Sequence, residues 1–423
     1  MPPHAERELP MLPEAELETL SNGLRIVYAL DDHAESVSFG LFVASGSRHE
    51  GPNDAGASHF IEHMLFKGTP TRSAVDLSRA IEGRGGNFNA WTSEEGTCFY
   101  AYMPADCLAT AVDVLCDMYL HAAIPSAEFA RERRVILEEI KMYDDEPDAV
   151  ASENLSRQLF PENPLGLPIA GRAETLAKMT PAYLRRYMRR GYVPSATVAV
   201  LAGRFDHDQA RRLVVARLGR RSCASPRTFT PLNPKTPVIP ERRVARDIQQ
   251  VQLALGYRTF GVTDDRRYAA AVFDTLMGRT MSSRLFQSVR ERRGLSYDIR
   301  SQLQFFAETG GWGVTAGLDA ARVQQALKAI DIEIDRIRQK KPSAAELRRT
   351  KDYLLGNFRL GFEQPRTRLF YFGLGVLTYG RIVPPAETAA RIADVSADEV
   401  LGVAQDILQD DRRAVSWVVP KAH

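Results

Sequence analysis

The hydrophobic and polar positions along the chain predict strands and helices in an order that occurs twice. In the first half, apolar-rich stretches of strand length cover residues 24–30, 36–44, 98–103 and 196–202. In the second half, strand-like stretches and helical patterns alternate over residues 250–257, 268–277, 310–316 and 320–338. Each half is therefore predicted to be α+β, with one mostly antiparallel sheet covered by helices on one side. An internal duplication explains the repeat.

An extended connection is predicted between the two halves. The segment from Arg220 to Arg242 contains prolines at positions 226, 231, 234, 237 and 240, which prevent any long helix there. At 423 residues and 44% apolar content, the chain is long enough for two or three domains with buried cores. We therefore expect one domain at residues 1–230 and a similar one at residues 231–423.

Charge and cysteine content narrow the class of protein. The formal net charge is +2, which creates no strong field for nucleic acid or an anionic membrane, so we expect neither as a partner. The 4 cysteines show no CxxC or paired spacing and are expected to be reduced thiols of a cytoplasmic protein. No run of about 18 apolar residues occurs. Residues 1–8 lack the apolar core of a signal peptide, although a mature form that has lost a targeting segment also fits.

Residues 59–63 read His-Phe-Ile-Glu-His and are the strongest candidate for chemistry. Two imidazoles four positions apart face the same side of a helix, so His59 and His63 can bind one zinc ion. Glu62 lies on nearly the same face and can take a proton from water on the metal, as in the inverted zinc-protease motif. The competing interpretation is a pair of core histidines on an amphipathic helix, where Phe60 and Met64 supply apolar neighbours.

A third zinc ligand is expected, because catalytic zinc sites use three protein ligands and leave one position for water. Residues 125–140 predict a helix with Ser126 as its N-cap. Glu132 and Glu139 share a face of this helix, so one can bind the metal while the other orients a ligand imidazole. Glu138 is an alternative ligand. A shift of one residue turns a carboxylate by about 100°, and register with Glu132 favours Glu139.

This arrangement resembles the pitrilysin/insulinase family of zinc metallopeptidases, in which a glutamate follows the second histidine by 76 residues, as Glu139 follows His63 here. It is similar to the mitochondrial processing peptidase beta subunit and its bacterial relatives of this size. The resemblance implies that His59, His63 and Glu139 hold one Zn²⁺ per chain. It also implies that Glu62 is the general base and that Glu132 is a supporting carboxylate required for activity.

Residues 85–92 extend the resemblance, because they are similar to the family's Gly-Gly-x-x-Asn-Ala-x-Thr segment. The backbone of that segment pairs with an extended substrate, which implies that Asn89 and Ala90 bind substrate by strand addition. The family also implies two similar domains that close around a peptide-sized cavity. Taken alone, these two residues are equally typical of a plain edge strand.

Residues 283–297 are similar to the second signature of the family. The resemblance implies that Arg290 and Tyr297 bind the substrate backbone and stabilise the tetrahedral intermediate. Without it, the arginine is typical of a solvated helix face and the tyrosine of a domain anchor. Because one chain carries both signatures, the family implies a homodimer, or a heteromer with a related subunit where the signatures are divided.

The function predicted is a zinc-dependent endopeptidase that cleaves peptides or unfolded segments. The first alternative is a non-catalytic scaffold or regulatory subunit of the same fold; such subunits characteristically lose motif residues, and no loss is identified here. The second alternative is a peptide-binding chaperone with a structural zinc, which requires a fourth protein ligand. Substrate, cleavage preference and pathway do not follow from the sequence.

Overall fold

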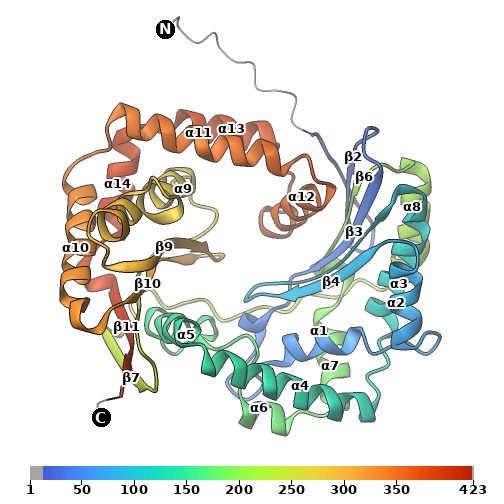
Figure 1. The fold of residues 1–423 in the computed structure, drawn as a ribbon. Helices are drawn as coiled ribbons and strands as arrows, with labels where there is room; N and C mark the ends of the chain where they lie inside the picture. The colour runs from blue at the N-terminus through green and yellow to red at the C-terminus, as the bar shows by residue number, and fades with distance from the viewer. Residues whose placement is uncertain (1–12, 422–423) are drawn as a thin grey trace, which may run out of the picture.

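Two β-sheets organise residues 13–421, the part of the chain that the computed structural model describes (Figure 1). The predicted absence of a signal core concerns residues outside this range. The strands of the first half are β1 Glu16–Thr19, β2 Arg25–Leu30, β3 Ser36–Val43, β4 Asn87–Thr92, β5 Thr97–Pro104 and β6 Thr197–Gly203. Those of the second half are β7 Glu241–Arg246, β8 Val251–Phe260, β9 Ser296–Phe305, β10 Thr309–Leu318 and β11 Arg413–Pro420.

Helices connect and cover these strands. In the first half they are α1 Ala57–Leu65, α2 Ala74–Glu82, α3 Leu108–His121, α4 Ser126–Asp145, α5 Pro147–Leu159, α6 Ala173–Lys178, α7 Pro181–Gly191 and α8 His207–Leu218. In the second half they are α9 Arg267–Asp274, α10 Val323–Gln339, α11 Ala344–Gly361, α12 Pro365–Tyr379, α13 Pro385–Asp394 and α14 Ala397–Ile407. The predicted strands are confirmed to within a few residues at their ends.

The two sheets share one topology. The first has the order β1-β2-β6-β3-β5-β4 and the second has the order β7-β11-β8-β10-β9. Without β1 the orders match strand for strand, including the one parallel pair in each sheet, β2 with β6 and β7 with β11. All other pairs are antiparallel. The predicted α+β class and the repeated order are therefore confirmed.

Helices cover both faces of each sheet, so the expectation of one covered side is wrong. Strand β6 shows why, because its sequence Thr-Val-Ala-Val-Leu-Ala-Gly is buried at every position. Val198 and Val200 pack toward α12, whereas Ala199 and Leu201 pack into the larger core on the opposite face. A strand with no polar face requires apolar cover on both sides.

The second cover of each sheet comes from the other half of the chain. Helix α5 packs on β8 and β11 of the second sheet, and α12 packs on β3 and β6 of the first sheet. Leu155 and Leu159 of α5 lie in a core with Ala254 and Val418, so this helix belongs by packing to the second sheet. The domain boundary between residues 230 and 231 stays a prediction. Helix α5 of the first half packs on the second sheet, and α12 of the second half packs on the first sheet.

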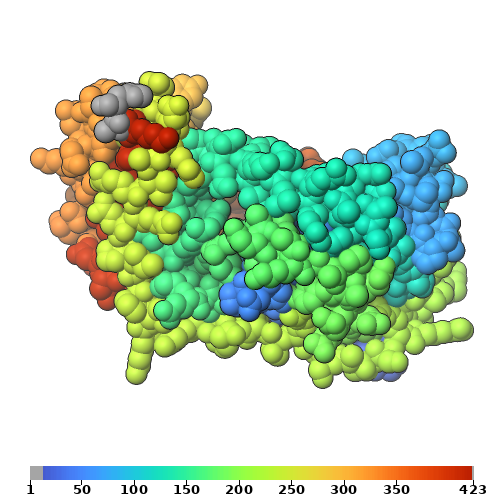
Figure 2. All heavy atoms as spheres, turned by 90° about the horizontal axis from the view of Figure 1, so that it is seen from below, coloured from blue at the N-terminus to red at the C-terminus, as the bar shows by residue number. Residues whose placement is uncertain are grey.

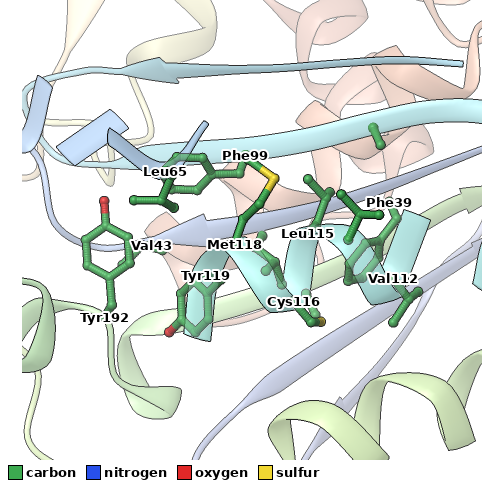
Figure 3. Close-up of a cluster of buried hydrophobic side chains, with 14 of the residues drawn as sticks. Phe39, Val43, Leu65, Phe99, Val112, Leu115, Cys116, Met118, Tyr119 and Tyr192 are labelled. Atoms are coloured by element: carbon green, nitrogen blue, oxygen red, sulfur yellow. The ribbon is translucent and has the colours of Figure 1, made fainter. Parts of the chain in front are cut away.

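The largest core lies between the first sheet and α3 (Figure 3). Phe39 and Phe99 project from neighbouring strands toward Leu115 and Met118 of α3, and all four side chains are buried. Leu65, at the end of α1, joins the same cluster. The helix with the histidine motif is thereby anchored to the sheet through its apolar side.

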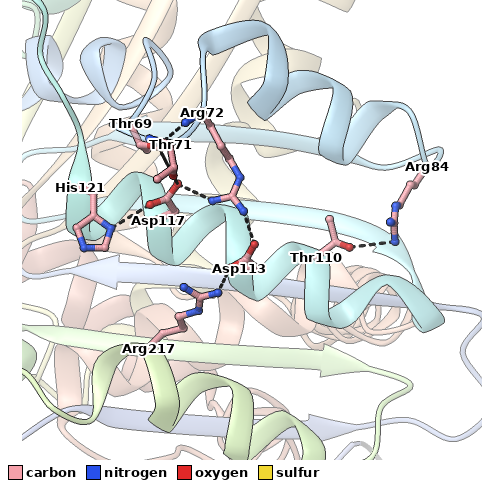
Figure 4. A network of polar contacts seen from close by, with 9 residues as sticks. All are labelled: Thr69, Thr71, Arg72, Arg84, Thr110, Asp113, Asp117, His121 and Arg217. Atoms are coloured by element: carbon pink, nitrogen blue, oxygen red, sulfur yellow. Dashed lines mark hydrogen bonds and ion pairs between the residues drawn. The ribbon is translucent and has the colours of Figure 1, made fainter.

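A polar network fixes the connection that follows α1 (Figure 4). Asp117 of α3 accepts hydrogen bonds from Thr69 at 2.8 Å and from Arg72 at 2.5 Å. Arg72 also pairs with Asp113, which binds Arg217 of α8. The segment between α1 and α2 is thus tied to two other helices of the first half.

Three predicted helices differ in detail from the structure. Ser126 is the first residue of α4 and not its N-cap; Pro125 occupies that position in an extended conformation, and its carbonyl accepts the N–H of Phe129. The helix predicted at 268–277 ends as α9 at Asp274 and continues as one π-helical turn. The helix predicted at 320–338 begins with a 3₁₀ turn before α10.

The segment after α8 has no helix until β7 begins at Glu241, as its prolines predict. Figure 2 shows yellow-green atoms of this part of the chain along the lower edge of the view, from one half to the other. Among the described residues, no single helix is long and apolar enough to cross a membrane. One consecutive pair, Ala105–His121 with Ser126–Asp145, passes that test jointly by length and composition, with a bend of 97°.

Candidate metal centre

The histidine motif and one glutamate of α4 converge on a single point. His59 Nε2 lies 3.7 Å from Glu139 Oε1, and His63 Nε2 lies 3.5 Å from Glu139 Oε2. One ligand atom from each residue lies within 4.8 Å of the others. Ligands about 2 Å from a tetrahedral zinc ion are separated from each other by roughly 3.3 Å, so these three side chains fit the metal. Within the described residues the group has three such members, the number of protein ligands that catalytic zinc sites use.

The packing of α1 and α4 orients these side chains. Phe60 and Ile61 of α1 are fully buried in the core, so the opposite side of the helix presents His59 and His63. Phe60 stacks on Phe129 of α4 with ring centroids 4.5 Å apart. Two apolar faces pressed together therefore set the polar faces of both helices side by side.

Glu132 is bonded to one of the two histidines. Its Oε2 lies 3.1 Å from His63 Nδ1, and its Oε1 lies 2.7 Å from Lys67 Nζ. Glu132 as a whole is only 4% exposed. His59 Nδ1 is buried and, among described atoms, has no hydrogen-bond partner. The Lys67–Glu132 pair thus fixes the ring orientation of His63 specifically.

The electrostatics of the cluster favour an ionised Glu139 and shift the pKa values of the two histidines in opposite directions. Burial and the nearby charge of His63 lower the pKa of His59 to about 4. Burial also opposes charge on His63, but its contacts with Glu139 and Glu132 outweigh this, and its pKa is raised. The hydrogen bond from His63 holds the pKa of Glu139 below its usual range. An ionised carboxylate and a neutral His59 are the forms that bind a cation.

Glu62 lies beside the three converging residues and contacts the sheet. Its Oε2 accepts a hydrogen bond from Thr92 Oγ1 at 2.5 Å. Burial raises the pKa of the Glu62 carboxyl, and the Thr92 hydrogen bond opposes this shift in part. A carboxylate whose pKa is raised is a stronger proton acceptor than an exposed glutamate.

Strand β4, which carries Asn89 and Ala90, is the edge of its sheet and pairs only with β5 among the described strands. Asn89 is exposed, and its Oδ1 accepts the N–H of Ala90 at 2.8 Å. Ala90 and Thr92 line a cavity of about 960 Å³ together with His59, Glu62 and Glu139. All lining residues of this cavity lie between positions 59 and 174, in the first half.

Glu138, the alternative ligand, points elsewhere. It is exposed and forms an ion pair with Lys141 at 2.8 Å. The turn of about 100° between successive helical residues separates it from the cluster that contains Glu139. The geometry therefore brings Glu139, and not its neighbour, to the two histidines.

Arg290 and Tyr297 lie together but not at this cluster. The Arg290 guanidinium lies 5.0 Å from the centre of the Tyr297 ring, and Tyr297 is 80% exposed. At the other end of β9, Gln304 bonds to Glu94 beyond β4. Seven residues of strand span about 23 Å, so Tyr297 lies far along β9 from this junction, and Figure 1 shows the start of β9 well away from α1. Neither residue lines the cavity.

Two contacts at this site were missed at the sequence level. Lys67 follows His63 by four residues, a spacing that places it near the same side of the helix axis, but a lone lysine is usually solvated. Thr92 belongs to the family-like segment without an assigned role. Its contact with Glu62 joins elements thirty positions apart, and no local pattern predicts such a pairing.

The chain is similar to known proteins along most of its length. Residues 25–173 match the family model described as insulinase (peptidase family M16), and residues 178–354 match the model of the peptidase M16 inactive domain. An uncharacterized zinc protease of Mycobacterium tuberculosis is 37% identical over 92% of this chain and 90% of its own length. An uncharacterized zinc protease of Bacillus subtilis is 33% identical over 93% of this chain and 95% of its own length.

Solved structures share the fold at low sequence identity. A protease from Helicobacter pylori aligns with a TM-score of 0.91 and 19% identity, covering 97% of this chain and 100% of that one. A putative M16-like peptidase from Alicyclobacillus acidocaldarius aligns with a TM-score of 0.85 and 22% identity, covering 99% and 100%. The resemblance inferred from the motifs is thereby confirmed, and the chain belongs to the insulinase family of peptidases, M16.

Proposed function

We propose that this chain is a zinc-dependent endopeptidase that cleaves peptides or unfolded segments. The observation that carries the proposal is the convergence of His59, His63 and Glu139, with Glu62 beside them at the free edge of a sheet. A structural zinc site closes with four protein ligands, whereas three ligands and an adjacent carboxylate are typical of catalytic ones. The zinc proteases among the relatives support the same chemistry.

The roles of the residues follow from their positions. When bound, one zinc ion per chain lowers the pKa of water and polarises a carbonyl oxygen. Glu62 accepts the proton of the attacking water and delivers it to the leaving amine. Glu132 orients His63, and Thr92 holds the Glu62 carboxyl, so both act through their neighbours.

The substrate is proposed to bind as an added strand along β4. An extended peptide satisfies the unpaired backbone groups of an edge strand, and Ala90 lies between that edge and the cavity. A peptide that pairs with the N–H of Ala90 displaces the Asn89 side chain that now binds it. Strand addition reads the backbone, which is available only in extended or unfolded segments.

Arg290 and Tyr297 are proposed to bind the substrate backbone and the developing oxyanion, as the family resemblance implies. Their separation from the cluster within the chain, and the exposure of Tyr297, favour action on the site of a second copy. We therefore propose a homodimer with two sites; a heteromer with a related subunit and a cytoplasmic location stay predictions.

The function is tested by incubating the zinc-loaded protein with a mixed peptide library and identifying products by mass spectrometry. Glu62→Gln is the matched control, because it keeps the three metal-binding side chains. We expect cleavage by the natural chain and about one zinc per chain in both, with turnover in the variant reduced ~100- to 10,000-fold.

Two results would refute the proposal. Full zinc occupancy without products from any peptide indicates a scaffold or peptide-holding protein. Turnover of Glu62→Gln near that of the natural chain means that another group is the base. If a partner subunit is required, the inactive protein would instead gain activity when it is mixed with an extract of cells that lack this chain.

A further inference from the structure

A short buried segment precedes the histidine helix and contains adjacent ionisable residues. The 3₁₀ turn Ser47–His49 and the following Glu50 are all buried; Arg48 is 1% exposed and Glu50 is 3% exposed. Charged groups removed from water are costly unless they are paired and hydrogen-bonded. The groups that pair with Arg48 and Glu50 are therefore the ones that hold this segment in place.

Arg48 joins the two halves of the molecule. Its guanidinium pairs with Glu95, in the turn between β4 and β5, and with Glu308, in the turn between β9 and β10. It also lies 3.8 Å from the ring centre of Phe229, in the connecting segment. Planar guanidinium groups suit such contacts, because they present several donors in a fixed arrangement and stack on aromatic rings. One buried side chain thus touches both halves and their connection.

The two carboxylates are themselves held across the junction. Glu95 accepts the backbone N–H of Ala307, at 3.0 Å, from the turn of the second half. Glu308 accepts the N–H of Leu232, at 2.7 Å, from the connecting segment. Arg48 is therefore the centre of a network whose geometry is correct only when the β9–β10 turn lies against the β4–β5 turn.

The same network reaches the candidate active site through the backbone. The N–H groups of Ser47 and Arg48 donate to the carbonyls of Ser93 and Glu94 at 3.1 and 2.7 Å. The backbones lie so close together that a Cβ atom at Gly46 would come within 2.2 Å of the Ser93 oxygen. Ser93 directly follows Thr92, which binds Glu62. Three non-covalent contacts, joined through the backbone, thus connect Glu308 in the second half to the proposed general base.

Glu50 connects the segment to the histidine helix itself. Its carboxylate accepts the N–H groups of Gly56 at 2.7 Å and Ser58 at 2.6 Å, at the start of α1. A carboxylate at a helix N-terminus is favoured by the unpaired N–H groups and by the helix dipole. The segment therefore holds the start of α1 at one end and the turn that follows β4 at the other.

We propose that Arg48 is a positioning residue that holds strand β4 against α1 when the β9–β10 turn of the second half is in place. It touches neither the metal-binding side chains nor Glu62, and it acts by fixing Thr92 relative to Glu62. This inference rests on the proposed peptidase function. It adds that the candidate site in the first half depends on a contact from the second half, the ion pair of Glu308 with Arg48.

The first test is a double-mutant cycle on turnover. Arg48→Met and Thr92→Val are made singly and together, and kcat and KM for one peptide are measured at saturating zinc. Each single variant is expected to lose about tenfold in kcat, as for partners that orient catalytic groups. The double variant is expected to lose little more than Thr92→Val alone, because Arg48 acts through Thr92. Zinc content should not change.

Arg72→Met is the matched control. Arg72 also pairs with two carboxylates in the first half, but its partners are on α3, away from β4 and the second half. Its replacement is expected to lower the melting temperature and to leave kcat within about twofold of the natural value. Any change in kcat should add to the loss caused by Thr92→Val. Glu308→Gln, in the other half, is expected to reproduce the kcat loss of Arg48→Met in part. Arg48→Lys provides a milder variant if Arg48→Met does not fold, since lysine cannot bind both carboxylates as a fork.

The second test does not depend on activity. Hydrogen exchange of the metal-free protein is followed at β4 and at the first turn of α1. We expect faster exchange there in Arg48→Met and in Glu308→Gln, but not in Arg72→Met. Unchanged exchange at β4, or kcat losses that add in full with Thr92→Val, would overturn the role of Arg48. A natural chain that cleaves no peptide would refute the proposed function, and the exchange result would still decide whether Arg48 couples the halves.

Discussion

Thr92 donates a 2.5 Å hydrogen bond to Glu62, which joins the edge strand of the first sheet to the helix of the histidine motif. The bond crosses from the proposed substrate-binding edge to the proposed base. A hydroxyl donor stabilises the ionised carboxylate, which is the form that accepts a proton. Strand and base are thus fixed relative to each other before any peptide arrives.

Thr92→Val should therefore lower turnover without removing the metal. Valine keeps the shape of threonine but lacks the hydroxyl, and we expect a loss of about tenfold in kcat. The effect of burial on the pKa of Glu62 is then opposed only by the charge of His63, so the acidic limb of the pH–rate profile should move to higher pH. Thr92→Ser, which keeps the donor, is the control. A valine variant with natural kcat and pH profile would show that the bond does not affect the base.

Glu139→Gln and Glu138→Gln should differ in zinc content. Glu139 lies 3.5 Å from His63, whereas Glu138 is paired with Lys141 at the surface. We expect steep loss of zinc in the first variant and near-natural occupancy in the second, measured by equilibrium dialysis and atomic absorption. The reverse ranking would contradict the assignment of the third ligand.

Glu132→Gln should impair activity more than metal binding. An amide can still contact His63, but it loses the charge that binds both Lys67 and the imidazole. Partners that orient a metal ligand typically contribute ~10- to 100-fold. Zinc affinity and kcat are compared on one preparation. If Glu132 only filled space in the core, the variant would melt at a lower temperature with kcat intact.

Tyr297→Phe should reduce kcat by about 100-fold, because one donor to the developing oxyanion is lost. Mixing this variant with Glu62→Gln distinguishes the two arrangements of the site. If Tyr297 acts on a second copy, each mixed dimer contains one complete site, and two inactive proteins regain activity together. If it acts within its own chain, the mixture stays inactive. The natural chain, unfolded and refolded in the same way, is the control.

His49 should make the metal-free protein less stable in acid. Burial and the nearby charge of Arg227 lower the pKa of His49 to about 4. Between about pH 6.5 and 4 the unfolded chain binds a proton that the folded chain does not, so stability falls as pH falls through this window. His49→Asn keeps an acceptor for the N–H of Gly46. Between pH 6.5 and 4, its free energy of unfolding should fall by up to about 3 kcal/mol less than that of the natural chain. Urea unfolding measures both, and equal losses would contradict the prediction.

The sequence by itself determined the strands, the repeated order of the halves and the candidate residues for the chemistry. These signals are local: apolar runs such as β6, the four-residue spacing of His59 and His63, and the seven-residue spacing of Glu132 and Glu139 are set by helix and strand geometry. The register argument for Glu139 over Glu138 is of the same kind. The resemblance to a family added roles that spacing alone did not give.

Only the tertiary structure decided which half covers which sheet and what holds the site together. The crossing of α5 and α12, the Thr92–Glu62 bond and the contacts of Arg48 join positions far apart in the chain. Buried charges such as Arg48 look like ordinary surface residues in a sequence, because their cost and their partners exist only after folding brings them together. Long-range pairs of this kind depend on how two cores pack, which no short pattern of residues records.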